Sequence, residues 1–263
     1  MPPRIFDSTI VSSEPIMGDS KLITLTAPEG MAREARAGHF VNVLCRGEGT
    51  YDPLLRRPFS VMRARPEQST IEILVRPFGR GSAWLDSQKI GTMVDVMGLH
   101  GNTYTINPGT RNLLLVAGGV GAAPLVMLSE EAAVRGLNVT YLMGSATEDG
   151  LLPASQLPDS VEYVVATDDG SRGHHGFVTD LVPNYARWAD QVFTCGPEPM
   201  FRALRNSLNP HRLGGKPPVQ VSMERSMACG VGACLGCVVE TKRGMSPSCL
   251  EGPVYDMDVV QWS

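Results

Sequence analysis

The sequence predicts an antiparallel β-barrel, then an α/β domain with a doubly wound parallel sheet, and finally a small cysteine-rich lobe. Three observations predict this order. Short runs of strand type, separated by Gly, Pro and Asp, fill residues 4 to about 105. After residues 107–109, continuous apolar strands alternate with helix-length segments. Four of the six cysteines lie between residues 229 and 249.

The expected barrel strands are short runs rich in β-branched or apolar residues, at 20–26, 39–44, 58–63, 70–76 and 93–97. Many short strands with turn residues between them are typical of a small antiparallel barrel or sandwich. One short helix is expected to begin at Gly81 and Ser82.

The expected strands of the second domain are more continuously apolar, at 113–117, 138–143, 161–166 and 191–194. A Gly-rich turn and a helix ending near residue 135 follow the first of them, and helix-length segments separate the others. Such alternation predicts a parallel sheet of doubly wound type. A chain of 263 residues can bury two cores, so the expected divisions are 1–107, 108–215 and 216–263.

Composition and charge narrow the class of protein. A hydrophobic fraction of 43% and a charged fraction of 19% are typical of a soluble globular protein. The net charge is -4 and no long basic run occurs, so neither nucleic acid nor an anionic membrane is an expected partner. No secretory signal and no apolar stretch of about 20 residues is visible, which favours a cytoplasmic location.

The cysteine spacing is Cys229-x4-Cys234-x2-Cys237-x11-Cys249. This matches the plant-type [2Fe–2S] pattern, and the Gly and Ala residues between the ligands let backbone N–H groups approach the sulfurs. A structural zinc site is the alternative, although zinc sites usually pair their cysteines in two short knuckles. In a reducing compartment such a crowd indicates a metal site rather than disulfides.

The region from 216 to 263 is shorter than a complete plant-type ferredoxin, so the cluster is expected in a short lobe of a larger protein. Val231 and Leu235 stand beside the ligands. Two interpretations of them remain open: an exposed surface for a partner, or packing against the second domain.

A second motif lies on the expected strand 58–63, where Arg57-Pro58-Phe59-Ser60 is followed by Leu74-Val75-Arg76 and by Gly81-Ser82. By itself it is a strand with a basic start. Together these segments resemble the FAD domain of the ferredoxin–NAD(P) reductase superfamily. The planar fork of a guanidinium suits a pyrophosphate, and so does a helix beginning at Gly81-Ser82. The resemblance implies that Arg57 binds the phosphates, that Pro58, Phe59 and Ser60 line the flavin, and that Leu74, Val75 and Arg76 form the neighbouring strand. Tyr is common where Phe59 stands.

A Gly-rich turn follows the strand at 113–117 and contains Gly118, Gly119, Gly121, Ala122 and Pro124. Such a turn between a buried strand and a helix lets the backbone approach a pyrophosphate. Pro124 replaces the third glycine of the usual dinucleotide fingerprint. The turn resembles the nicotinamide-side loop of the same superfamily, which implies that these residues bind NAD.

Cys195-Gly196-Pro197 follows the last strand and resembles the Cys-Gly-Pro motif of that superfamily. The resemblance implies that Cys195 lies near the nicotinamide and the flavin, in a catalytic position, and that Gly196 and Pro197 contact NAD. The alternative for Cys195 is a buried structural thiol. Asp168, at the end of the third strand, borders the dinucleotide or belongs to an ordinary polar turn.

The choice between NAD and NADP can be argued from charge. No Lys or Arg occurs from residue 143 to residue 162, whereas this segment contains Glu148 and Asp149. A 2′-phosphate would need a cation there, so the sequence predicts NAD. If this prediction were wrong, cations from elsewhere, Arg172 for example, would serve the 2′-phosphate.

The three cofactors imply one function, because NAD exchanges electron pairs, a [2Fe–2S] cluster exchanges single electrons, and FAD can do both. Six motifs in order resemble the electron-transfer subunits of NAD-linked, two-subunit dihydroorotate dehydrogenases: RPFS, GGVGAAPL, ATDDGS with GFVTD, CGPEPM, MERSMACGVGACLGC and CLEGPVY. The resemblance implies a partner catalytic subunit with FMN that oxidises dihydroorotate, in a heterotetramer of two plus two subunits. It also implies an FAD-binding region at 1–107, an NAD-binding region at 108–215 and a cluster lobe at 216–263.

Two other functions remain open. The chain could be the small subunit of a ferredoxin-dependent transhydrogenase or of a hydrogenase/sulfide-reductase complex. It could also be a zinc-bound interaction module without enzymatic activity.

Overall fold

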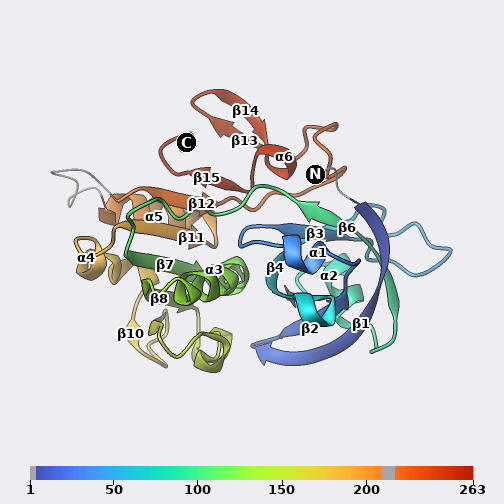
Figure 1. The fold of residues 1–263 in the computed structure, drawn as a ribbon, viewed down its shortest axis with the longest axis horizontal. Coiled ribbons are helices and arrows are strands. Elements are labelled where there is room, and N and C mark those ends of the chain that lie inside the picture. The colour runs from blue at the N-terminus through green and yellow to red at the C-terminus, as the bar shows by residue number, and fades with distance from the viewer. Residues whose placement is uncertain (1–3, 209–216, 263) are drawn as a thin grey trace.

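A closed antiparallel barrel forms the N-terminal part of the computed structural model, which describes residues 4–208 and 217–262 (Figure 1). Its strands follow the order β1-β2-β5-β4-β3-β6. They are β1 (Arg4–Met17), β2 (Ser20–Thr26), β3 (Phe40–Val43), β4 (Arg57–Arg65), β5 (Thr70–Val75) and β6 (Met93–His100). Two short helices, α1 (Met31–Glu34) and α2 (Arg80–Asp86), and a 3-10 turn at Pro66–Gln68 join them. The predicted antiparallel barrel is confirmed, and β1 and α1 are elements that the sequence did not single out.

Every second side chain along the barrel strands points inward and fills the barrel. On β2 and β5, Ile23 pairs with Ile73 and Leu25 pairs with Ile71, and all four side chains are fully buried. In a strand, successive side chains point to opposite faces, so these residues fill the barrel while their neighbours face outward.

The α/β part is a sheet with the order β10-β9-β8-β7-β11-β12-β15. Its strands are β7 (Asn112–Gly118), β8 (Asn138–Ser145), β9 (Glu162–Thr167), β10 (His174–His175), β11 (Gln191–Cys195), β12 (Val219–Ser222) and β15 (Val254–Asp256). All neighbours pair in parallel except β12 and β15. Strand order reverses at β7, which lies between β8 and β11, so ligands are expected at the carboxyl ends of these strands.

The helices of this part are fewer than expected. A 3-10 turn at Gly119–Gly121 leads into α3 (Ala122–Val134), and α5 (Glu198–Leu208) follows β11, but between β8 and β9 there are only 3-10 turns at Glu148–Gly150 and Ala154–Gln156. Between β9 and β11 the helical elements are a 3-10 turn at Val178–Asp180 and α4 (Val182–Tyr185). The expectation of helix-length segments is wrong here. Pro153 and Pro158 oppose a continuous helix, while Leu151, Leu152 and Leu157 are buried and cover the sheet without one.

The C-terminal region contributes to two parts of the molecule. It forms the hairpin of β13 (Val238–Thr241) and β14 (Gly244–Pro247) and the helix α6 (Ser248–Glu251), which Figure 1 shows in red above the junction of barrel and sheet. The same region supplies β12 and β15 to the large sheet. The division at residue 216 therefore stays a prediction, since strands on its far side pair with β11.

Barrel and sheet share one core and a polar connection. Helix α3 lies between them (Figure 1), and its residues belong to the same apolar cluster as those of the barrel. The buried Arg63 of β4 forms ion pairs with Glu130 of α3 and with Glu72 of β5. Arg63 also donates to Gln156 at 2.8 Å, and the Tyr104 hydroxyl donates to the Thr194 carbonyl at 3.0 Å. These contacts hold the barrel and the sheet in a fixed arrangement.

None of the helices in residues 4–208 and 217–262 combines the length and the apolar character needed to cross a membrane.

Candidate functional site

The two arginines at the start of β4 have different surroundings. Arg56 donates from Nη2 to both carboxylate oxygens of Asp95, at 2.9 and 2.8 Å, so its guanidinium is used within the barrel. Arg57 donates from Nη1 to the Leu55 carbonyl at 2.7 Å. In the described part of the chain no hydrogen bond or ion pair uses its Nε or Nη2. Arg57 is thus the arginine that can still bind a phosphate.

Arg57 lies against the start of α2. A Cβ atom placed on Gly81 would be 2.9 Å from Arg57 Cγ and 3.0 Å from its Nε, so a side chain at position 81 would displace Arg57 from this position. Ser82 receives the Gly79 N–H at 3.0 Å and closes the first turn. The guanidinium and the first backbone N–H groups of α2 therefore form a cradle of donors, which fits a pyrophosphate.

The strand that begins at Arg57 has a half-buried face. Residues 57–60, which include Phe59 and Ser60, are all partly exposed, whereas the next three residues, 61–63, are buried. Leu74 and Val75 of β5 are both buried, so they offer a cofactor little side-chain surface. Arg76 is exposed and pairs with Asp19 at 3.0 Å. The structure brings Arg57, Gly81 and Ser82 together, but Arg76 has a partner elsewhere.

The two glycine motifs of the sheet meet at the carboxyl ends of β7 and β11. A Cβ atom on Gly121 would overlap the Cys195 carbonyl, and one on Gly118 would be 3.0 Å from Pro197 Cδ. Gly196 has φ of +156° and would also meet Gly118. The turn after β7 and the turn after β11 are thus in backbone contact, and a side chain at any of these glycines would separate them. Residues 118–120 of the first turn are partly exposed, so a dinucleotide can approach their backbone. Ala122 and Pro124 begin α3 and are buried.

Cys195 is 1% exposed and lies in register between Ala117 of β7 and Ser222 of β12. Burial raises the pKa of its thiol well above the ordinary value, and the nearby Glu224 carboxylate raises it further. The thiol therefore stays protonated at neutral pH. This geometry gives it the character of a small neutral group rather than a nucleophile.

Glu224 is a titratable group near Cys195 that the sequence analysis did not select. It follows β12, and its side chain reaches solvent, yet the surrounding protein raises the pKa of its carboxyl. The only available signal was its position in the MERSMAC motif before the first cluster cysteine.

The expected ribose loop lies at the carboxyl ends of β8 and β9. The Asp168 N–H donates to the Ser145 carbonyl at 3.0 Å, and the Asp168 side chain is exposed. Arg172 Nη1 is 3.5 Å from Glu148 Oε1. The alternative cation for a 2′-phosphate is therefore near the expected place, but an acidic residue already pairs with it.

Backbone N–H groups point at the cysteine sulfurs. The Val231 and Cys234 N–H groups donate to Cys229 Sγ at 3.4 Å, and the Gly232 N–H donates to Cys249 Sγ at 3.1 Å. The N–H groups of Val231 and Cys234 lower the pKa of the Cys229 thiol to about 6, and Val231 has the larger effect. Such N–H···S bonds stabilise the thiolates that an iron–sulfur cluster requires.

The four thiols approach one another in two pairs. The Cys234 N–H donates to Cys229 Sγ, and the Cys249 N–H donates to Cys237 Sγ at 3.4 Å. Burial, followed by the neighbouring Cys237 thiol, raises the pKa of Cys249 to about 11. Two pairs suit a cluster in which each of two irons takes two thiolates. Among the described residues, no group of three or more His, Cys, Asp or Glu side chains is arranged around a single ion.

The cluster loop rests on the outside of the barrel. Gly230 has φ of +70°, and a Cβ there would be 2.7 Å from Asn42 Nδ2 and 2.7 Å from Met97 Cε. Asn42 and His100 are buried, and both Asn42 side-chain atoms and His100 Nε2 have no hydrogen-bond partner in the described chain. Asn42 pairs in register with Pro58 of β4. One strand therefore separates the cluster loop from the strand expected to bind flavin.

Comparison with solved structures defines the class. The chain is similar to a subunit of an NADH-dependent reduced ferredoxin-NADP oxidoreductase studied for flavin-based electron bifurcation, with a TM-score of 0.84 and 29% identity. The match covers 97% of this chain and 90% of that one. The barrel, the parallel sheet and the C-terminal cysteine region together form the ferredoxin reductase fold with an added iron–sulfur binding domain.

Sequence comparison identifies the family. Residues 224–261 match the model of the iron–sulfur cluster binding domain of dihydroorotate dehydrogenase B. The chain is 36% identical over 267 residues to the dihydroorotate dehydrogenase B (NAD(+)) electron transfer subunit of Desulforamulus reducens, covering 98% of this chain and 99% of that protein. The subunit of the same name from Geobacillus thermodenitrificans is 35% identical, with 94% and 95% covered. The chain belongs to the family of dihydroorotate dehydrogenase B electron transfer subunits.

Proposed function

We propose that this chain transfers electrons between a partner subunit and NAD through a [2Fe–2S] cluster and FAD, as the electron-transfer subunit of an NAD-linked dihydroorotate dehydrogenase. The observation that carries the proposal is the contact of Gly230 with Asn42, because it sets the cluster loop one strand away from β4. Family membership supports the same assignment.

Three sets of residues are assigned. The FAD set is Arg57, Pro58, Phe59, Ser60, Leu74, Val75, Arg76, Gly81 and Ser82. The NAD set is Gly118, Gly119, Gly121, Ala122, Pro124, Asp168, Gly196 and Pro197, with Cys195 near the nicotinamide. The cluster set is Cys229, Cys234, Cys237 and Cys249. The Arg57 cradle, the touching glycine turns and the N–H···S bonds support these sets respectively.

Each set has a physical task in the transfer. When bound, FAD supplies the conversion between hydride exchange with NAD and single-electron exchange with the cluster. Arg57 neutralises pyrophosphate charge and orients the cofactor along β4. The backbone N–H groups of the Gly118–Gly121 turn bind the dinucleotide phosphates. The buried neutral thiol of Cys195 fills the space behind the nicotinamide site without adding charge.

The expected partner is an FMN-containing catalytic subunit that oxidises dihydroorotate, in a heterotetramer of two plus two subunits. The surface around the cluster loop supports a docked partner. Val231 is 44% exposed, Leu235 60% and Leu250 54%. Val231 and Leu235 belong to the same loop as the exposed Cys234, and Leu250 Cγ lies 2.9 Å from the point where Gly232 would carry a Cβ. An apolar patch next to a redox centre suits a protein partner, so the exposed interpretation of Val231 and Leu235 is favoured.

Reconstitution tests the proposed function. The chain with its FMN subunit should couple dihydroorotate oxidation to NAD reduction, while the chain alone should pass electrons from NADH to a dye. Failure of the mixture, with both subunits fully loaded, would contradict the assigned partner.

A second candidate is the small subunit of a ferredoxin-dependent transhydrogenase, which the similarity to the bifurcating oxidoreductase favours. Anaerobic co-purification separates the two candidates, because each predicts a different flavoprotein bound to this chain. Zinc in place of iron in such a preparation would instead support the interaction module.

A further inference from the structure

Asn42 of β3 is a buried polar residue to which the proposed function gives no chemical task. It is 1% exposed, and neither its Nδ2 nor its Oδ1 has a hydrogen-bond partner in the part of the chain that the structure describes. Buried amides are normally paired, and an apolar side chain of similar size could be buried at lower cost. The partner of this amide is therefore expected among the groups that the protein binds.

The Asn42 side chain lies on the outer face of the barrel, toward the cluster region. Val41 and Val43 are fully buried in the barrel core, so Phe40 and Asn42 point the opposite way. Phe40 packs on two of the proposed cluster ligands, Cys237 and Cys249. The outer face of β3 is thus the floor on which the cluster loop rests.

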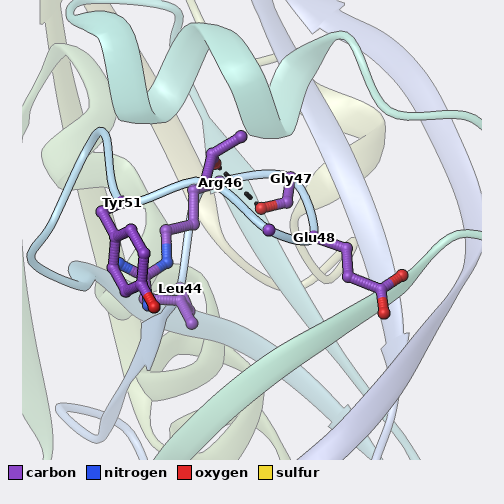
Figure 2. A pocket seen from close by; sticks show the side chains of 7 residues that line it. Leu44, Arg46, Gly47, Glu48 and Tyr51 are labelled. Atoms are coloured by element: carbon purple, nitrogen blue, oxygen red, sulfur yellow. Dashed lines mark hydrogen bonds between the residues drawn. The ribbon is translucent and has the colours of Figure 1, made fainter.

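This floor ends where β3 ends. Leu44 is the next residue in the alternation, and it lines a pocket formed by the loop that follows β3, where Figure 2 shows it together with Arg46 and Tyr51. The lining of that pocket includes no residue of the described cluster region. Phe40 and Asn42 are therefore the outward-facing residues of β3 that can meet the cluster loop.

Asn42 is the middle residue of a row across three strands. It pairs with Met97 of β6 on one side and with Pro58 of β4 on the other, and paired residues share a face of the sheet. Gly230 lies over this row, because a Cβ on it would be 2.7 Å from both Asn42 Nδ2 and Met97 Cε. Side chains of Met and Pro cannot donate, and a thioether is only a weak acceptor. The row itself therefore offers the amide no partner.

The sulfurs of the cluster site are acceptors close to this amide in the fold. Gly230 directly follows Cys229, so Asn42 Nδ2 lies beside the segment that contains the first ligand. In the described chain, the nitrogen donors to the four sulfurs are backbone N–H groups, those of Val231, Gly232, Cys234, Gly236 and Cys249. Sulfurs that ligate iron accept hydrogen bonds, and such bonds are one determinant of the potential of a cluster.

We propose that the Asn42 amide donates a hydrogen bond to a sulfur of the bound [2Fe–2S] cluster site and thereby raises its reduction potential. The inference rests on the proposed function, because it requires the cluster at Cys229, Cys234, Cys237 and Cys249. A cluster held by four thiolates is negatively charged and becomes more negative on reduction. A donor therefore stabilises the reduced form more than the oxidised form. Asn42 thus favours uptake of an electron on the side of the cluster loop that faces the flavin strand.

An anaerobic redox titration of the full-length holoprotein, monitored by EPR of the reduced cluster, tests this role. Asn42→Leu keeps the approximate size of the side chain and removes the donor. It should disfavour the reduced cluster by about tenfold, which lowers a one-electron potential by about 59 mV. The flavin potential, followed by absorbance in the same titration, should be unchanged. Pulsed EPR in D2O should show one exchangeable proton fewer near the cluster.

Asn42→Asp is a second variant that keeps the shape of the side chain. It replaces the donor with a group that only accepts when ionised and that adds negative charge near the cluster. Its cluster potential should fall at least as far as that of Asn42→Leu. Iron and sulfide contents of each variant are measured first, so that only fully loaded proteins are compared.

Two controls separate the hydrogen bond from packing and from burial. Met97→Leu changes the other side chain that meets Gly230 but removes no donor, so it should keep the wild-type cluster potential. Thr70→Val removes another buried polar atom without a partner in the described chain. Thr70 belongs to β5, which is not a neighbour of β3 in the barrel, so this variant should also keep the wild-type potential.

An unchanged cluster potential in Asn42→Leu and Asn42→Asp would overturn the inference. An equal shift in Met97→Leu would also overturn it, because the effect would then come from packing against the loop. A shift confined to the flavin would assign the amide to FAD instead of the cluster. Zinc in place of iron in the wild-type protein would contradict the proposed function itself, and metal analysis detects that result before any titration.

Discussion

Gly230 of the cluster loop packs directly on Asn42 of the barrel strand β3, at a distance that leaves no room for a side chain on residue 230. The two residues are far apart in sequence, and their contact is where the cluster region meets the flavin region. Asn42 is also paired with Pro58 in the β3–β4 ladder. The contact of Gly230 with Asn42 and the pairing of Asn42 with Pro58 therefore link the cluster loop to the strand that is proposed to bind flavin.

Gly230→Ala should therefore destabilise the cluster and leave the flavin in place. The variant adds a Cβ 2.7 Å from Asn42 Nδ2 and requires φ of +70° from a residue that disfavours it. We expect faster loss of iron and an altered EPR spectrum of the reduced cluster, with flavin content unchanged. Gly109→Ala is the matched control, since Gly109 has φ of +85° but open space around it. Equal iron loss in the two variants would show that backbone strain alone, and not the contact with Asn42, explains the effect.

Removing one cluster ligand should abolish electron transfer from the partner subunit and spare electron exchange between NADH and FAD. Cys249→Ser should abolish NAD-linked dihydroorotate oxidation in the reconstituted complex. It should spare much of the NADH–dye activity, because hydride exchange with FAD does not involve the cysteines. The measurements are the two steady-state rates and the iron content. Full coupled turnover by a cluster-free variant would contradict the order FMN, [2Fe–2S], FAD, NAD.

The neighbouring arginines of β4 should respond differently to alanine. Arg57→Ala should weaken FAD retention by about 1–3 kcal/mol, the range for a hydrogen bond to a charged group, while the thermal midpoint changes little. Arg56→Ala breaks the partly buried pair with Asp95 of β6 and should lower stability instead. Flavin release on dilution and thermal unfolding measure the two effects. If Arg57→Ala retained FAD as the wild type does, the cradle assignment would be wrong.

The ion pair of Glu148 with Arg172 should keep kcat/KM for NADPH low. We expect the wild-type chain to prefer NADH, because Glu148 neutralises the cation nearest the expected ribose. Glu148→Gln should raise kcat/KM for NADPH and leave that for NADH almost unchanged. Adding Arg172→Ala should reverse the gain, since a 2′-phosphate is normally bound by a cation. A gain that survives the second substitution would assign the 2′-phosphate to another residue.

His39 should make the protein less stable in mild acid. Burial, followed by the charge of Arg36, lowers the pKa of His39 to about 4, and its Nδ1 accepts the Arg36 N–H at 3.1 Å. In the unfolded chain the pKa is near 6.5, so between these values the unfolded state binds more protons. Stability is therefore greatest above pH 6.5 and falls as the pH drops through 4, by about 3 kcal/mol in all.

Urea unfolding at pH 7 and pH 4.5 measures this loss. His39→Gln keeps an acceptor for the Arg36 N–H but cannot be protonated, so it should lose less stability between the two pH values than the wild type. An identical loss in both proteins would assign the acid sensitivity to other groups, of which the buried His100 is one.

The sequence predicted those features that depend on local pattern. The run 20–26 corresponds to β2, since Ile23 and Leu25 alternate with outward-facing residues, and the turn at Gly118 was visible from its glycines. Strand β1 was missed because its burial does not alternate regularly, and Ile5 is largely exposed. The roles of Asn42 and His100 had no local signal, because both are buried by a loop that begins more than a hundred residues later.

The pairing of β12 with β15 also determines the order in which the parts of the molecule can form. The chain leaves the sheet at Ser222 and returns to it at Val254, and these two residues are partners in the same antiparallel ladder. The cysteine segment is therefore a loop whose ends are already held together, so the entropy of closing it is lost when the sheet folds. Cluster assembly can then follow folding of the rest of the chain and needs only local ordering.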